Sequence, residues 1–98
     1  MLVHTVLMKT KPGTTPAELR DLTLRIRLLA STASGGGSFA VGPNVTEEPL
    51  DQGYSFGFVL NFADHGALDA YHINPAHMAI SLLIRDLAAE ILVFDIES

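Results

Sequence analysis

The alternating side chains of residues 54–62 constrain the fold of this chain more than any other feature. Strict alternation over this length predicts a β-strand. One face of the segment is large and apolar, and the other is flat, with small side chains. The large face consists of Tyr54, Phe56, Phe58, Leu60 and Phe62. The flat face consists of Ser55, Gly57, Val59 and Asn61, and such a face allows a second sheet to approach closely.

Three other segments are expected to be strands. Residues 2–9 alternate with largely apolar side chains on both faces, which predicts a strand inside a sheet that is covered on both sides. Residues 38–42 predict a short, weak strand, and residues 91–96 predict a final one. Residues 34–37 cannot hold a helix, and the polar residues 43–53 predict a solvated loop.

The first helix is predicted to start at Thr15-Pro16-Ala17-Glu18. Thr15 can cap it, Pro16 suits the first helical position, and Glu18 can complete a capping box. The helix should run to about Leu29 or Ser31. Helical spacing predicts its buried side, which consists of Leu19, Leu22, Ile26 and Leu29.

The second helical region is predicted in two pieces. Asp64 can cap a short helix that reaches Tyr71, and Asn74 can cap a second one with Pro75 at its first position. Met78 and Leu82 are the expected buried residues of the second piece. Further candidates for that buried side are Ile80, Leu83 and Leu87.

These elements follow the order β-α-β-β-α-β, with the second α broken in two. That order predicts an α+β, ferredoxin-like fold in a single domain over residues 1–98, with a four-stranded antiparallel sheet and helices on one face. The other face of the sheet would remain bare and apolar. The hydrophobic content of 48% is high for 98 residues. We therefore expect a homodimer that forms through the bare face.

Charge and composition exclude several classes of function. The net charge of −5 and only six basic residues argue against nucleic acid or an anionic membrane as a partner. No apolar run approaches the length of about 20 residues that a bilayer-spanning helix needs. The absence of cysteine excludes disulfides, thiolate metal sites and a cysteine nucleophile. With no signal-peptide pattern at the N-terminus, the expected location is the cytoplasm.

The segment from Tyr71 to His77 carries the best candidates for chemistry. His77 falls at the third helical position after Asn74, where the positive end of the helix favours a neutral imidazole that can accept a proton. Tyr71 lies just before the Asn74-Pro75 break, and this break can aim both side chains into one space.

His4, Phe56 and Phe58 are predicted to line the same space, as a polar group and an apolar wall. A histidine in a strand is more often a hydrogen-bonded core residue, and Tyr71 could simply pack. His72 and His65 are expected at the surface. Because His72 and His77 are five residues apart across a break, they do not match a helical metal pair, so no metal or other cofactor is expected.

Several of these segments together resemble the stress-responsive α/β-barrel (Dabb) family, which includes polyketide cyclases of the olivetolic acid cyclase type. They are the His4 strand, Gly53-Tyr54, the Asn74-Pro75-Ala76-His77 turn and the Val93-Phe94-Asp95 ending. The resemblance implies a dimer whose two sheets form an α/β barrel. It also implies that Tyr71 and His77 match the Tyr and His that assist an aldol condensation in the cyclases, and that His4 matches their first-strand His.

This chain departs from the cyclases at two positions. It has Phe56 where they carry a second pocket histidine, and Asn74 where they have histidine before the proline. The leading hypothesis is therefore an apolar pocket for a small carbonyl or aromatic compound, with cofactor-free, cyclase-like proton transfer if the protein is an enzyme. The alternatives are a non-catalytic module for small ligands or stress response and, third, a cofactor-independent monooxygenase.

Overall fold

The computed structural model describes residues 1–33 and 38–98, and it confirms the predicted order of elements. The expected break at residues 34–37 lies outside the described part of the chain. The strands are β1 (Leu2–Thr10), β2 (Phe39–Pro43), β3 (Phe56–Phe62) and β4 (Ala88–Glu97). The helices are α1 (Pro16–Ala33), α2 (His65–His72) and α3 (Pro75–Leu87).

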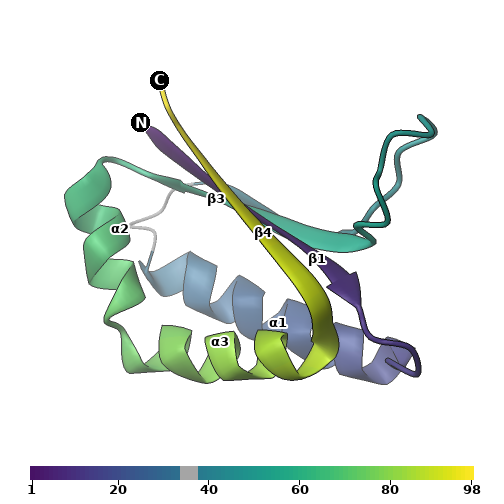
Figure 1. Ribbon diagram of the computed structural model, residues 1–98. Coiled ribbons are helices and arrows are strands. Elements are labelled where there is room, and N and C mark those ends of the chain that lie inside the picture. The colour runs from purple at the N-terminus through teal and green to yellow at the C-terminus, as the bar shows by residue number, and fades with distance from the viewer. Residues whose placement is uncertain (34–37) are drawn as a thin grey trace.

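The four strands form one antiparallel sheet in the order β2-β3-β1-β4. Figure 1 shows α1 and α3 side by side on one face of this sheet, with α2 at one end. The β2–β3 connection projects away from the body of the molecule. The two ends of the chain meet beside each other, where the Met1 amine donates to the carbonyl of Ser98 at 2.8 Å. This is the ferredoxin-like fold that the sequence predicts.

Alternation along β1 and β3 separates the two faces of the sheet. Every second side chain of β3 is buried against the helices, from Phe56 to Phe62. Gly57 lies on the opposite face, and a Cβ atom built there would come within 2.8 Å of the Leu7 side chain and 2.9 Å of the Val6 carbonyl. A side chain at this position would push β1 and β3 apart.

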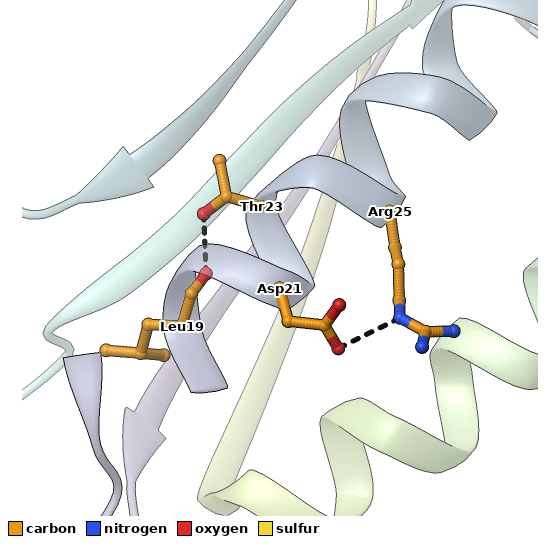
Figure 2. A network of polar contacts seen from close by, with 4 residues as sticks. All are labelled: Leu19, Asp21, Thr23 and Arg25. Carbon is orange, nitrogen blue, oxygen red and sulfur yellow. Dashed lines mark hydrogen bonds and ion pairs between the residues drawn. The ribbon is translucent and has the colours of Figure 1, made fainter. Parts of the chain in front are cut away.

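Helix α1 begins with the predicted capping box. The Glu18 amide donates to the Thr15 hydroxyl at 3.2 Å, and the Thr15 amide donates to the Glu18 carboxylate at 2.9 Å. Figure 2 shows polar contacts along this helix, including an Arg25–Asp21 ion pair at 3.0 Å. The predicted buried residues Leu22, Ile26 and Leu29 are in the core, and Leu19 packs against it.

Helices α2 and α3 begin at the predicted caps. The side-chain oxygens of Asp64 and Asn74 each accept a backbone N–H of the following turn at 2.9 Å. The predicted buried side of α3 is partly wrong, because Met78 and Leu82 are 60% and 66% exposed. The buried residues of this helix are Ile80, Ile84 and Leu87. Helix α3 carries apolar side chains on most of its sides, so helical spacing alone did not determine which side faces the sheet.

The described helices leave the other face of the sheet uncovered, and the β2–β3 connection borders a hollow on it beside Leu7, Gly57 and Val59. The strand register places side chains of β1, β3 and β4 together on this face. They are Val3, Thr5, Leu7, Gly57, Val59, Asn61, Leu92, Phe94 and Ile96, and we call this set the bare face. The β4 members are the most exposed, with Phe94 at 58% and Ile96 at 49%. None of the described helices is long and apolar enough to span a membrane.

Candidate functional site

A cavity of about 260 Å³ lies between the helices and the β1–β4 side of the sheet. It lies on the covered face, so the bare face does not contribute to it. Most of its wall is aliphatic or aromatic. Its lining residues include His4, Val6, Phe58, Tyr71, His72, His77, Ser81, Ile84, Arg85, Ile91, Val93 and Asp95.

Tyr71 and His77 meet in this cavity, with ring centroids 4.4 Å apart. The chain break between the two helices brings them together. Helix α2 ends at His72, and Asn74 starts α3 with an extended backbone (φ −68°, ψ 127°). On one continuous helix, residues six apart would point to different sides. The Asn74-Pro75 break removes that constraint.

The surroundings of His77 favour its neutral imidazole over the charged form. Burial lowers the pKa of His77 from its ordinary value of 6.5, and the neighbouring His72 and His4 rings add to this shift, while the His72 backbone opposes it. Its Nδ1 is shielded from solvent and has no hydrogen-bond partner within the described part of the chain. A neutral ring of this kind can accept a proton near pH 7.

Tyr71 has the opposite character, because it holds its proton firmly. Burial raises the pKa of the Tyr71 phenol to about 12. The ring is 3% exposed and packs against Phe62 with centroids 5.2 Å apart. At neutral pH the hydroxyl is therefore a hydrogen-bond donor rather than a phenolate.

His4 is buried and is held by Asp95, which faces it across the β1–β4 pairing. The two side chains contact each other through Nδ1 and Oδ1 at 2.5 Å. Because a carboxylate can only accept, Nδ1 of His4 donates, and Nε2 is the ring nitrogen that remains for another group. The His4 ring lies edge-on to Tyr71, with centroids 6.2 Å apart.

His72 joins this cluster although it is exposed at the surface, as the sequence predicted. Its ring centroid lies 5.7 Å from those of His4 and Tyr71 and 5.3 Å from that of His77. Within residues 1–33 and 38–98, no three acidic or histidine side chains form a group that could hold a metal ion. The cluster consists of three imidazoles and one phenol in the wall of an apolar cavity.

The two phenylalanines that were predicted as pocket walls are placed differently. Phe58 lines the cavity, opposite Val6 in the strand register. Phe56 is buried but is not part of the cavity wall, because it pairs with Met8, two strand positions farther from His4. It lines instead an open hollow beside the β2–β3 loop.

Sequence reasoning missed four polar side chains of the cavity, namely His72, Ser81, Arg85 and Asp95. Spacing could have found two of them. Ser81 and Arg85 follow His77 at intervals of four residues, which places all three on one side of a helix. Asp95 could have been found by pairing the first strand with the last, since His4 and Asp95 each stand near an end of the chain.

Comparison with known proteins places the chain in a family. Residues 2–98 match the family model "Stress responsive A/B Barrel Domain", Dabb. The chain belongs to this family. A curated relative from Arabidopsis thaliana, the stress-response A/B barrel domain-containing protein HS1, is 27% identical over 92 residues, which are 94% of this chain and 84% of that protein.

Solved structures agree with the fold. A dimeric ferredoxin-like protein of unknown function from Jannaschia sp. CCS1 is 29% identical, with a TM-score of 0.85 over 99% of this chain and 98% of that chain. SnoaB, a cofactor-independent oxygenase from Streptomyces nogalater, is 14% identical, with a TM-score of 0.75 over 99% and 91% of the two chains. At that identity the likeness to SnoaB concerns the fold alone.

Proposed function

We propose that this Dabb protein binds a small carbonyl or aromatic compound in the cavity and catalyses proton transfer next to the carbonyl group without a cofactor. One observation carries the proposal. A proton-accepting imidazole, His77, and a proton-holding phenol, Tyr71, lie 4.4 Å apart between ring centroids in one apolar cavity. Burial shifts the pKa values of the two groups in opposite directions, and titratable pairs separated in this way are typical of active sites.

In the proposed reaction, His77 removes a proton from the carbon next to the ligand's carbonyl. Because Nδ1 is shielded, Nε2 takes that proton. The electron pair of the C–H bond moves into an enolate, and the Tyr71 hydroxyl donates a hydrogen bond to its oxygen. Return of the proton from His77 to carbon completes an exchange. In a cyclisation, the enolate carbon instead attacks a second carbonyl of the same ligand, the π electrons of that carbonyl move to its oxygen, and this oxygen takes the proton from His77.

Exchange of ligand protons for deuterium tests the proposal even when the natural substrate is not known. Acetophenone and neutral aryl 1,3-diketones are incubated with the protein in D₂O, and loss of the proton signal next to the carbonyl is followed by NMR. We expect exchange above the buffer rate. His77→Ala should reduce the enzymatic rate by about 10²–10⁴-fold, because it removes the general base.

Tyr71→Phe separates the enzyme from the second candidate, a non-catalytic module that binds a small ligand. The close packing of Tyr71 on Phe62 favours this alternative, because it gives the ring a role without chemistry. An enzyme loses turnover in Tyr71→Phe but retains binding, whereas a binding module retains its affinity and shows no turnover in either form. Exchange that continues at the original rate in His77→Ala would contradict the catalytic proposal.

A cofactor-independent monooxygenase is the third candidate, because SnoaB shows that an oxygenase uses this fold. Oxygen consumption with a quinol-type substrate would support it. A constant oxygen concentration, together with deuterium exchange into ketones, would favour proton transfer instead.

The proposed working form is a cytoplasmic homodimer that assembles through the bare face. The dimeric relative from Jannaschia supports self-association. The exposed apolar side chains of β4 support the choice of face, since Phe94 and Ile96 of the bare face are 58% and 49% exposed in the single chain. A patch of this kind is typical of a protein–protein contact.

A further inference from the structure

Helix α3 presents a row of three polar side chains to the cavity. His77, Ser81 and Arg85 recur at intervals of four residues, and all three line it. On the sheet, the wall carries the apolar Val6, Ile91 and Val93 as well as the paired side chains of His4 and Asp95. Ser81 and Arg85 therefore add polar groups to the cavity beyond the imidazole cluster. A ligand that fits it carries more than one polar group.

Arg85 lies at the far end of this row from the imidazole cluster. Eight residues of α-helix separate it from His77, which corresponds to a rise of about 12 Å. Its side chain is part of the cavity wall. Ile84 and Ile91 surround this end with apolar surface.

The Arg85 guanidinium has no carboxylate within ion-pair distance among the residues that the structure describes. Lys11 adds a second positive charge at the same end, since its amine donates to the Arg85 carbonyl at 3.4 Å. Among the described residues that line the cavity, Asp95 is the only one with a carboxylate, and it pairs with His4 at the other end. The cavity wall is therefore negatively charged at Asp95, beside the imidazoles, and positively charged at Arg85.

We propose that Arg85 selects ligands with a carboxylate, so that the substrate class is a small oxo acid whose carbonyl lies at Tyr71 and His77. The guanidinium binds a carboxylate through two parallel hydrogen bonds. Asp95 repels an anion at the opposite end, and this fixes the direction in which the ligand enters. The cavity volume of about 260 Å³ limits the ligand to a small molecule. The inference rests on the proposed function of the same cavity.

Binding of matched acids and amides tests this selection. The probes are p-acetylbenzoate and the longer p-acetylcinnamate, each compared with its neutral amide by isothermal titration calorimetry at low ionic strength. The wild-type protein should bind at least one acid about tenfold more tightly than its amide, the size of effect expected for a charged hydrogen bond. Arg85→Gln should remove that preference without weakening binding of the amides. Arg85→Lys should retain part of it.

Arg27→Gln is the control, because Arg27 is an exposed arginine on α1 that does not line the cavity. It removes the same charge from the protein and should leave the preference unchanged. Both arginines are exposed, so neither change should lower the thermal unfolding temperature. Equal affinity of acid and amide at both probe lengths, or the same preference in Arg85→Gln as in the wild type, would overturn the inference. So would a failure of all four probes to bind at millimolar concentration.

Failure of the proposed reaction leaves a different signature. If His77→Ala exchanges acetophenone protons at the wild-type rate while the acid preference still depends on Arg85, then the catalytic proposal fails and the cavity is a carboxylate-binding site. If exchange requires His77 but acids and amides bind equally, then the reaction is retained and the role of Arg85 is wrong.

Discussion

At the scale of single residues, the lowered pKa of His77 predicts a pH dependence. The folded protein disfavours the charged imidazole, so His77 binds its proton below pH 6.5, at a lower pH than in the unfolded chain. The unfolded state therefore binds more protons in this window. The contribution of His77 to stability is complete above pH 6.5 and is lost as the pH falls toward the folded pKa.

An NMR titration of the imidazole C–H signals measures this directly. The midpoint assigned to His77 should lie below pH 6.5, and the acid limb of the exchange reaction should share that midpoint, because only the neutral ring removes a proton. His77→Gln should flatten the loss of thermal stability between neutral pH and pH 5. A His77 midpoint at or above 6.5 would show that the ring is not desolvated as the cavity suggests.

Two contacts between single residues show what the sequence could and could not predict. The Asn74-Pro75 break, read from capping rules, led to the expectation that Tyr71 and His77 share a space, and their rings are adjacent. The Asp95 contact with His4 was not foreseen, since it depends on the pairing of two strands that stand at opposite ends of the chain. Local rules predict caps and faces, whereas a contact between distant segments requires the register of the sheet.

At the scale of elements, the cap of α3 is predicted to stabilise the protein and to hold His77 in place. The Asn74 side chain accepts the Ala76 N–H at 2.9 Å. Asn74→Ala should lower the free energy of unfolding by about 1 kcal/mol, as measured by urea denaturation at fixed protein concentration. Asn74→Asp is the matched control and should cost much less, since aspartate caps as well as asparagine does. Equal losses in the two variants would mean that the amide group has another role.

The elements differ in how well their sequence patterns predicted them. Strand β3 alternates clearly, and its aromatic face is buried as predicted, because a period of two leaves only two choices. Strand β1 was predicted to be covered on both sides, whereas only one of its faces is buried in the single chain. Helix α3 has apolar residues on most sides, and the side chosen from spacing was partly wrong, as Met78 and Leu82 show. Strand β4 starts three residues earlier than expected, at Ala88, because it follows α3 without a separate turn.

At the scale of the whole molecule, the bare face predicts that a charge on β4 disrupts the proposed dimer. Phe94 is 58% exposed in the single chain and stands beside Thr5 in the register of the bare face. Phe94→Glu should place an unpaired carboxylate between two apolar sheets, and this should weaken dimerisation by about 100-fold or more. Analytical ultracentrifugation over a range of concentrations measures the change in the dissociation constant.

Leu28→Glu is the control at this scale, because Leu28 is 70% exposed on α1 and lies on the helix-covered side of the molecule. It introduces the same charge at a similarly exposed apolar position. If the two sheets pack together, only Phe94→Glu dissociates the dimer. If Leu28→Glu alone dissociates it, then the subunits meet through the helices and the sheets do not form a barrel. The cavity lies on the covered side of the sheet, so a monomeric Phe94→Glu protein should still bind p-acetylbenzoate, which separates assembly from ligand recognition.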